Sequence, residues 1–360
     1  MAHIDDMLRH MKQHKGSDLH LAAGIAPRMR SHGELVAVEG WPVLTDASLR
    51  ELVREIAAES DWAKFEASGD LDFAYGLEGV ARFRANYFVQ ERGAGAVFRI
   101  IPEEILSLED LKLPAAIGSF CHLNQGLVLI TGPTGSGKST TLAAVINEIN
   151  RSYSRHIVTI EDPVEFVHQN QQSILSHREV GSHTRGFTPA LRASIRQDAD
   201  VVLVGEMRDM ETIALAITAA EMGMLVFGTL HTNSATKTVD RIVDAFPAEE
   251  QNQIRVSLSE SLAGVVSQLL LRTADGKGRC AVHEILLKTS GLANVIREGN
   301  TPMLNSLIQS GKAQGMQSMD DALFAAVQSG KVRAVDAHMK ATDKARFEAL
   351  IAKEEGAGAS

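Results

Sequence analysis

Cysteine is scarce in this sequence, because a chain of 360 residues carries only Cys121 and Cys280. Two cysteines are too few for a disulfide framework or for a four-cysteine zinc site, which excludes a fold that depends on either. A cysteine among apolar residues usually behaves as a small hydrophobic side chain. We therefore expect both thiols to be buried.

Aromatic residues and positive charge are also in short supply. Aromatic residues make up 5% of the chain, and the formal net charge is −9. Proteins that move along single-stranded nucleic acid need a basic channel with aromatic side chains on which the bases stack. The composition therefore disfavours a RecA-like nucleic-acid translocase, which is kept as the weaker alternative, and no nucleic-acid partner is expected.

The sequence has no long uninterrupted hydrophobic run. The longest apolar stretch, Ile213 to Leu230, contains Glu221 and Gly223, so it predicts a helix followed by a strand and not a membrane span. Met1 to Lys15 has the pattern of a charged amphipathic helix and not that of a signal peptide. We expect a cytoplasmic protein without an integral membrane segment, long enough for two or three domains.

A glycine-rich loop between a strand pattern and a helix pattern is the most informative feature of the chain. Leu127 to Ile130 has the character of a buried parallel strand, and an apolar helical face recurs from Leu142 to Ile149. The loop between them matches the G-x-x-x-x-G-K-[ST] phosphate-binding pattern, or Walker A. Glycines let backbone N–H groups turn toward an anion, and the start of the helix adds positive charge.

ATP or ADP with Mg²⁺ is the expected ligand of this loop. The Lys138 amine can reach the β- and γ-phosphates, and the Ser139 hydroxyl can bind Mg²⁺. A glycine turn before an ordinary helix would not require this Lys-Ser pair. The residues expected to contact the nucleotide are Gly132, Pro133, Thr134, Gly135, Ser136, Gly137, Lys138, Ser139 and Thr140.

Acidic residues follow two other predicted strands. Glu206 comes after an apolar strand and a glycine, as in a Walker B element, and is expected to bind Mg²⁺. Glu161, Asp162 and Glu165 follow an earlier strand. Carboxylates this close repel one another unless a cation or hydrogen-bond donors compensate, which favours a place near Mg²⁺. A solvated acidic loop stays open as the alternative for Asp162.

Four more residues are candidates for contact with the γ-phosphate. His231 follows another predicted strand, where a structural histidine is as reasonable as a functional one. Arg82 and Arg84 are two residues apart on one strand and share a face, while Arg99 stands on the next strand. These arginines are either a solvated sheet edge, which is the commoner case, or arginine fingers that reach a neighbouring subunit's nucleotide.

Strand and helix patterns divide the chain into parts. Residues 1–100 mix short strands and helices, which predicts a small α+β domain, and residues 101–118 have the proline and glycine content of a linker. Strands and helices alternate through residues 119–287, which predicts an α/β core with a parallel sheet. Residues 288–360 have helical patterns and predict a helical C-terminal domain.

Individual elements follow from the same patterns. We expect a turn at His32-Gly33, a helix capped by Thr45, a buried strand at Val201–Val204, one long helix over Ala248–Leu271 and a last strand at Arg279–Leu287.

With these motifs in hand, the sequence resembles the secretion ATPases of type IV pili and type II secretion. TIEDPVEF resembles the family's Asp box, VVLVGEMRD its Walker B element and GTLHTNSA its His box, all in the family's order. The similarity continues through GSDLHLAAG, RFRANYFVQERGAGAVFRIIP and GMQSMDDAL, and within the family it is typical of retraction motors of twitching motility. The tetracysteine motif and longer N-terminal region usual in assembly and secretion ATPases are missing from this sequence.

The resemblance implies a PAS-like N-terminal domain, a RecA-like core and a homohexameric ring that hydrolyses ATP to retract type IV pili. It implies Lys138 and Ser139 as phosphate and Mg²⁺ ligands and Glu206 as the Walker B acid. Glu165 would activate water, with Glu161 and Glu206 left open for that role. His231 would sense the γ-phosphate, and the three arginines would act in trans.

The resemblance also implies partners and a location. An inner-membrane pilus platform protein is the expected partner, with this chain bound peripherally at the pilus base, and a sister motor ATPase is a further candidate. Gly291 to Glu298 keeps only the second half of the AIRNLIRE sequence typical of retraction motors. An accessory or paralogous pilus or secretion ATPase is therefore the alternative.

Overall fold

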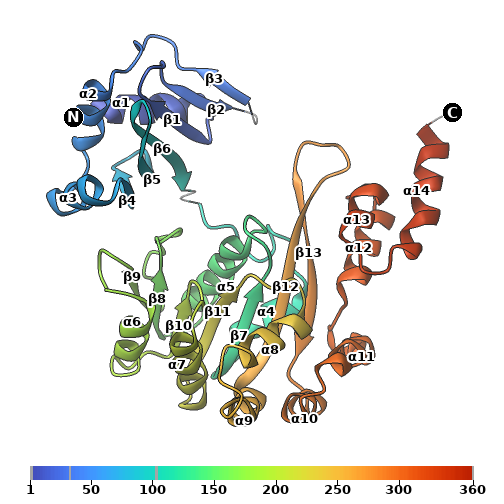
Figure 1. Ribbon diagram of the computed structural model, residues 1–360. Coiled ribbons are helices and arrows are strands. Elements are labelled where there is room, and N and C mark those ends of the chain that lie inside the picture. The colour runs from blue at the N-terminus through green and yellow to red at the C-terminus, as the bar shows by residue number, and fades with distance from the viewer. Residues whose placement is uncertain (1–2, 32–33, 102–103, 359–360) are drawn as a thin grey trace. The chain divides into compact units, whose positions relative to one another are not determined.

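The computed structural model describes residues 3–31, 34–101 and 104–358, and the chain forms two compact units. The first unit comprises the chain up to Glu104 together with the segment Pro163–Val167, and the second comprises Ile105–Asp162 and the chain from His168 onward (Figure 1). The turn predicted at His32-Gly33 lies outside the described residues, as do residues 102–103 of the predicted linker.

Over its described residues, the first unit is a six-stranded antiparallel sheet in the order β3-β2-β1-β6-β5-β4, with helices packed against it. The strands are β1 (Asp18–Ala22), β2 (Arg28–Ser31), β3 (Glu34–Ala37), β4 (Asp70–Leu77), β5 (Ala81–Gln90) and β6 (Gly93–Ile101). The helices are α1 (His3–Gln13), α2 (Asp46–Arg54) and α3 (Glu59–Ser68). The α+β composition predicted for this region is confirmed.

Local sequence explains one helix of this unit better than another. α2 begins at the predicted cap, where the Thr45 hydroxyl accepts the Ser48 N–H at 3.1 Å and the Ser48 hydroxyl accepts the Thr45 N–H at 2.9 Å. α3 was not predicted. Only Trp62 and Phe65 are buried along it, so it has no periodic apolar face to reveal it.

The second unit is organised around a seven-stranded sheet in the order β13-β12-β7-β11-β10-β8-β9. Neighbouring strands are parallel except for β12 and β13, which are antiparallel. The strands are β7 (Gly126–Thr131), β8 (His156–Glu161), β9 (Ile174–Glu179), β10 (Val201–Val204), β11 (Leu225–Leu230), β12 (Leu262–Arg272) and β13 (Arg279–Leu287). This confirms the predicted α/β core with a parallel sheet.

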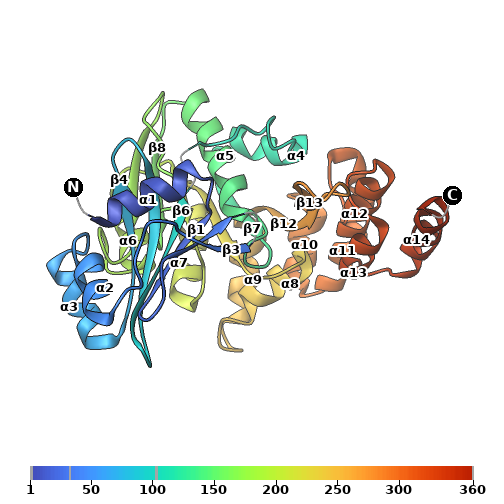
Figure 2. The same ribbon diagram turned by 90° about the horizontal axis from the view of Figure 1, so that it is seen from above.

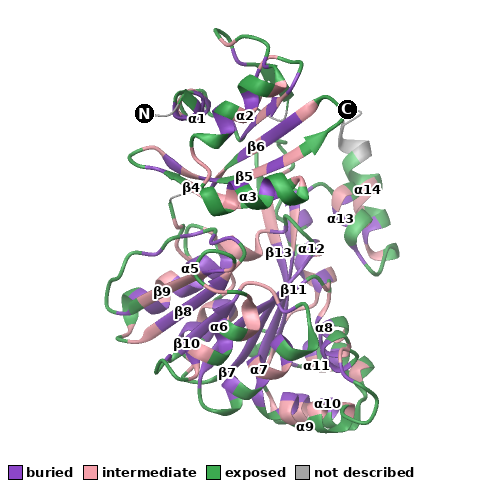
Figure 3. Cartoon of the chain, turned by 60° about the vertical axis from the view of Figure 1, so that its left-hand side comes forward, coloured by how far each residue is buried: buried purple, intermediate pink, exposed green. Residues whose placement is uncertain are grey.

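Helices cover both faces of this sheet, so its central strands are buried on both sides (Figure 3). Successive residues of β10 show this directly. Val202 and Val204 pack into the hydrophobic cluster that includes α7, whereas Val201 and Leu203 pack into the cluster that includes α5. The helices of this unit are α4 (Ala115–Gly118), α5 (Lys138–Ser152), α6 (Phe187–Ser194), α7 (Met210–Glu221), α8 (Ala235–Val243), α9 (Gln251–Ser261), α10 (Ser290–Glu298), α11 (Leu304–Ser310), α12 (Met319–Gln328), α13 (Ala334–Lys340) and α14 (Ala345–Gly358), with short 3₁₀ turns at Ser119–His122, Thr301–Met303 and Lys312–Gln314.

The last helices form their own hydrophobic cluster beside β12 and β13 (Figures 1 and 2). Leu271 of β12 and Val282 of β13 pack there with Leu323 of α12 and Phe347 of α14. The helical character predicted for this part of the chain is confirmed. In the part of the chain that is described, no helix has both the length and the apolar character required to cross a bilayer.

The helix predicted over Ala248–Leu271 is wrong in its second half. α9 ends at Ser261, and the chain continues as β12, which pairs with β7 on one side and β13 on the other. A continuous apolar run does not distinguish a buried helix from a buried strand by periodicity. The β-branched pair Val265-Val266 and the adjacent Gly264 were the local signals for a strand.

The two cysteines differ in environment. Cys121 is completely buried, and this burial raises the pKa of its thiol to about 12, so it is inert at neutral pH. Cys280 is only half-buried. The prediction that both thiols are buried is therefore confirmed for Cys121 and wrong for Cys280, which lies on β13 near the end of the sheet.

Candidate active site

The predicted motifs of the second unit gather at one edge of its sheet. β7, β11, β10 and β8 are neighbours in parallel register, so their carboxyl ends meet at the same edge. The phosphate loop follows β7, His231 follows β11, Glu206 follows β10, and Glu161 ends β8. Open α/β sheets bind their ligands at this edge.

The phosphate loop depends on glycines with positive φ. The φ angles are 147° at Gly132, 77° at Gly135 and 86° at Gly137, a region that other residues rarely adopt. A Cβ atom at Gly132 would overlap the Gln268 carbonyl oxygen, whereas one at Gly135 would meet nothing within 4 Å. The loop is therefore packed tightly against β12 at its start and open at its tip.

The start of α5 supplies groups that suit a phosphate. Lys138 is the first residue of this helix, and its amine donates to the carbonyl oxygens of Gly132 at 2.8 Å and Pro133 at 3.2 Å. The amine thus lies over the loop that precedes it. Ser139 and Thr140, both half-buried, add hydroxyls in the same turn. A cationic amine, helix N-terminal N–H groups and hydroxyls together fit an anionic ligand.

Glu206 lies between two basic side chains. Its Oε1 atom is 2.7 Å from Nε of Arg208 and 3.1 Å from Nε2 of His231. The hydrogen bond from Arg208 lowers the pKa of Glu206, so this carboxyl group is ionised at neutral pH. The negative charge of Asp162 also contributes to raising the pKa of Arg208. Arg208 therefore supplies part of the positive charge expected to offset the repulsion between the clustered carboxylates. This role was not predicted from the sequence, although Arg208 lies within VVLVGEMRD.

The turn that carries Glu206 is held close to the end of β8. The Gly205 N–H donates to the Ile160 carbonyl at 2.8 Å, and the Thr229 hydroxyl donates to the Gly205 carbonyl. A Cβ atom at Gly205 would lie 3.3 Å from Cα of Glu161. Glycine at this position therefore lets Glu206 and Glu161 lie on neighbouring strand ends. Thr229 was not predicted, because only the fold brings it to Gly205.

The three candidate arginines lie on one face of the first unit's sheet. Arg84 of β5 is directly opposite Arg99 of β6, and Arg82 is two residues along from Arg84. Each of the two exposed arginines has an acidic neighbour: the Nε atom of Arg99 donates to Asp18 at 2.7 Å, and that of Arg84 is 3.6 Å from Asp72. The predicted shared face is therefore present.

Glu165 belongs to the same compact unit as these arginines. It is an exposed residue of the segment Pro163–Val167, which belongs to the first unit. In that unit Arg82 donates to the carbonyl of Val164 at 3.3 Å. The structure thus brings Glu161, Glu206 and His231 to the sheet edge beside the phosphate loop, and places Glu165 and the arginines in the first unit.

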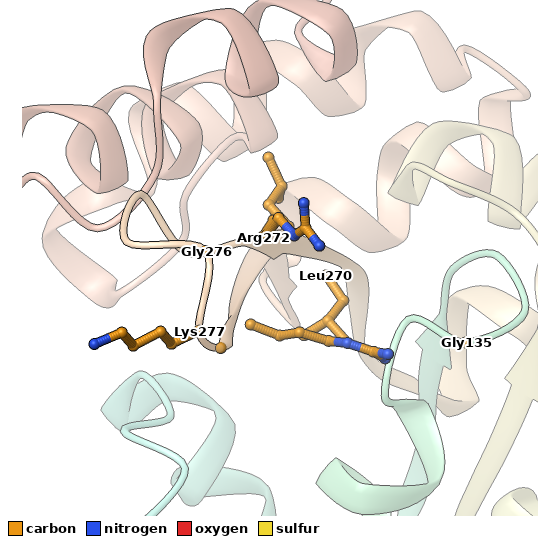
Figure 4. A pocket seen from close by; sticks show the side chains of 8 residues that line it. Gly135, Leu270, Arg272, Gly276 and Lys277 are labelled. Atoms are coloured by element: carbon orange, nitrogen blue, oxygen red, sulfur yellow. The ribbon is translucent and has the colours of Figure 1, made fainter. Parts of the chain in front are cut away.

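A pocket of about 350 Å³ lies beside the tip of the phosphate loop (Figure 4). Gly135 lines it on the loop side, and the hairpin between β12 and β13 lines it on the other. Its hairpin residues are Leu270, Leu271, Arg272, Gly276, Lys277, Gly278 and Arg279. A lining of exposed cationic side chains, with Leu270 beside them, suits an anionic ligand that carries a flat ring.

Mg²⁺ can be accommodated without a dedicated metal cage. Within the described ranges, no group of three or more His, Cys, Asp or Glu side chains is arranged to hold a metal ion. In phosphoryl-transfer enzymes Mg²⁺ is held by one or two protein oxygens and by the substrate phosphates. The Ser139 hydroxyl and the ionised Glu206 carboxylate are oxygen donors of this kind.

Comparison with known proteins identifies the family. The model of the family described as type II/IV secretion system protein matches residues 2–339. The chain belongs to this family. Its sequence is 47% identical over 338 residues to the type IV pilus retraction ATPase PilT of Pseudomonas aeruginosa. The aligned region covers 94% of this chain and 98% of that protein.

Other members of the family agree with this assignment. The chain is 50% identical over 306 residues to a twitching motility protein of Neisseria gonorrhoeae, covering 85% of this chain and 82% of that one. The crystal structure of the pilus retraction motor PilT with bound ADP matches with a TM-score of 0.89 at 41% identity, covering 96% of this chain and 98% of the other. The predicted resemblance to the secretion ATPases, the fold class and the ATPase class are confirmed.

Proposed function

We propose that this chain is the motor ATPase that retracts type IV pili. The observation that carries the proposal is the association of the phosphate loop with Glu206 and His231 at one sheet edge, on a chain 47% identical to a retraction ATPase over nearly its whole length. A relative named for twitching motility supports the same conclusion.

The phosphate loop binds the β- and γ-phosphates of ATP. The Lys138 amine and the N–H groups at the start of α5 neutralise and orient the phosphates. Ser139 and Glu206 would hold Mg²⁺, which would supply further positive charge to the phosphates. The hydrogen bond from Arg208 lowers the pKa of Glu206, so this carboxylate is available as a ligand at neutral pH.

Hydrolysis needs a residue that orients water and groups that neutralise the γ-phosphate. Glu165 is the proposed base, with Glu161 and Glu206 as alternatives, and His231 senses the γ-phosphate through its contact with Glu206. Arg82, Arg84 and Arg99 of a neighbouring subunit complete the charge neutralisation in trans. Product release then loosens the contact between subunits.

Mechanical output follows from that loosening. The chain forms a homohexameric ring. In each subunit a PAS-like domain (1–100) closes and opens on the RecA-like core (119–287) across the linker (101–118). These motions occur one after another around the ring and drive an inner-membrane platform protein that returns pilin to the membrane. The helical C-terminal domain (288–360), the cytoplasmic location at the pilus base and a sister motor are further parts of this proposal.

The pocket beside Gly135 is the proposed place for the ribose and base. Glu206 and His231 follow strands on one side of β7, so the γ-phosphate points to that side. β12 and β13 lie on the other side of β7, and their hairpin lines the pocket. The rest of the nucleotide therefore extends toward Arg272 and Arg279.

Removing a cationic side chain from this pocket should weaken nucleotide binding selectively. We expect Arg279→Ala to raise the Kd for ADP by about threefold to tenfold, the range of a lost guanidinium–ring contact, and to leave the Kd for tripolyphosphate unchanged. Isothermal titration with both ligands measures this. Lys340→Ala, at an exposed site at the end of α13, is the control for net charge. Equal effects of Arg279→Ala on both ligands would contradict this placement.

Deletion of the gene tests the direction of the motor. A retraction motor predicts cells with many surface pili and no twitching, because fibres are assembled and never withdrawn. Electron microscopy of pili and a twitching assay measure the two properties, and complementation with the Lys138→Ala variant should not restore movement. Bald cells would indicate an extension motor, and a deletion strain that twitches normally would indicate the accessory or paralogous ATPase.

A further inference from the structure

Gln268 is a buried amide behind the phosphate loop. It lies on β12 with 2% of its surface exposed, one residue beyond the last pair of the β12–β7 ladder, Ser267 and Thr131. The hydroxyls of that last pair are themselves hydrogen-bonded at 2.8 Å. β12 therefore continues along the loop after its pairing with β7 has ended, and Gln268 is the first residue there.

Both ends of the Gln268 amide are used. Its Nε2 atom donates to the Ser136 carbonyl at 2.7 Å, and its Oε1 atom accepts the Thr141 hydroxyl at 2.8 Å. The Ser136 carbonyl can only accept, which determines which end of the amide faces the loop. One side chain thus joins the loop to the first turn of α5.

The Gln268 backbone contacts the same loop at another point. Its carbonyl oxygen occupies the space that a Cβ atom at Gly132 would need, and its Nε2 atom is 2.9 Å from the place of a Cβ atom at Gly137. The first and last glycines of the loop therefore both pack on this one residue. A side chain at Gly132 is excluded by the Gln268 carbonyl, and at Gly137 the positive φ of 86° also favours glycine.

The hydrogen bond to Ser136 has a consequence for the loop's N–H groups. In a planar trans peptide, the carbonyl of Ser136 and the N–H of Gly137 point in opposite directions. Holding the carbonyl toward β12 turns the N–H away from β12. Glycines on this loop allow the peptide to flip, and a flipped peptide would present a carbonyl oxygen to an anion, which repels it.

We propose that Gln268 is a positioning residue that locks the Ser136–Gly137 peptide with its N–H available to phosphate. It acts through the loop and does not touch the ligand. The inference rests on the proposed function, since it assumes that the loop binds the phosphates of ATP. It goes beyond that function because it assigns the loop's conformation to a residue on a different strand, 132 positions along the chain.

The test compares a variant that removes both hydrogen bonds of the Gln268 amide with one that removes only the bond to Thr141. We expect Gln268→Leu to raise the Kd for both ADP and inorganic tripolyphosphate by about tenfold, the size of one hydrogen bond to a charged or constrained group. Thr141→Val removes only the bond to Oε1 and should change both constants by less than about threefold. Isothermal titration on the full chain measures the constants, and thermal melting reports stability.

A double variant separates positioning from packing. Gln268→Leu with Thr141→Val places apolar groups at both sites, so part of the melting temperature lost in Gln268→Leu should return. The affinity for tripolyphosphate should stay low, because the Ser136 carbonyl is still not held. Gln268→Met, which has nearly the same length and neither a charge nor an N–H donor for Ser136, should lose affinity as Gln268→Leu does and serves if that variant fails to fold.

The possible results are distinct. If affinity returned together with the melting temperature in the double variant, or if Gln268→Met bound tripolyphosphate as tightly as wild type, Gln268 would be a packing residue and the inference would be wrong. If the wild-type chain bound neither ADP nor tripolyphosphate, the proposed function and this inference would both be overturned.

Discussion

Replacement of Lys138 by alanine should abolish turnover by weakening nucleotide binding. We expect the Kd for ADP to rise by about 10²-fold, because the only cationic side chain at the start of α5 is lost from the phosphate site. The amine also donates to the carbonyls of Gly132 and Pro133, so its loss leaves their negative ends facing the phosphates. Titration with ADP and a steady-state phosphate assay measure the two effects.

Two further variants sharpen this prediction. Lys138→Arg keeps the charge but replaces a compact ammonium by a planar fork, and it should recover little of the activity. Lys340→Ala, which removes an exposed lysine at the end of α13, should behave as wild type. Wild-type affinity for ADP in Lys138→Ala would show that the loop does not bind the phosphates.

Replacement of Glu206 by glutamine should separate binding from chemistry. We expect kcat to fall by about 10³-fold while the Kd for ADP stays within about threefold of wild type, because the lost charge acts on Mg²⁺ and the γ-phosphate and not on the loop. Glutamine has nearly the same shape and keeps an oxygen to accept the hydrogen bond from Arg208. Single-turnover phosphate release and titration with ADP provide the comparison.

The matched control for Glu206 lies on the same unit. Glu221 is exposed at the end of α7, and Glu221→Gln removes one carboxylate away from the phosphate loop without changing turnover. An active Glu206→Gln enzyme would remove Glu206 from the mechanism. A parallel loss of ADP binding and turnover would instead make Glu206 part of the nucleotide's ground-state site.

A feature could be predicted from the sequence when the residues that determine it lie close together along the chain. The phosphate loop was recognisable because its strand, glycines, Lys138 and helix are contiguous, and each residue type has a local physical reason. The same is true of the Thr45 cap and of β10, whose apolar residues are adjacent. The order of the motifs along the chain was enough to identify the family, since each motif is itself a short segment.

Other features depend on neighbours that the chain brings from a distance. β12 has the apolar composition of a helix or a buried strand, and only pairing with β7 and β13 made it a strand. That choice placed Gln268 behind the phosphate loop, where no pattern predicted it. The ion pair of Glu206 with Arg208 was within reach of the sequence, because both belong to one short motif, but the contact of Glu206 with His231 required β10 and β11 to be neighbours.

The sequence by itself therefore determined the chemistry of this protein: a phosphate loop, acidic residues after parallel strands and membership in the secretion ATPases. Tertiary structure alone decided which strand supports the loop, which basic groups compensate Glu206, and that Glu165 belongs to the unit that carries the arginines. The physical reason is that a motif's local conformation depends on adjacent residues. Hydrogen bonds and packing between strands depend instead on which strands are neighbours in the folded sheet.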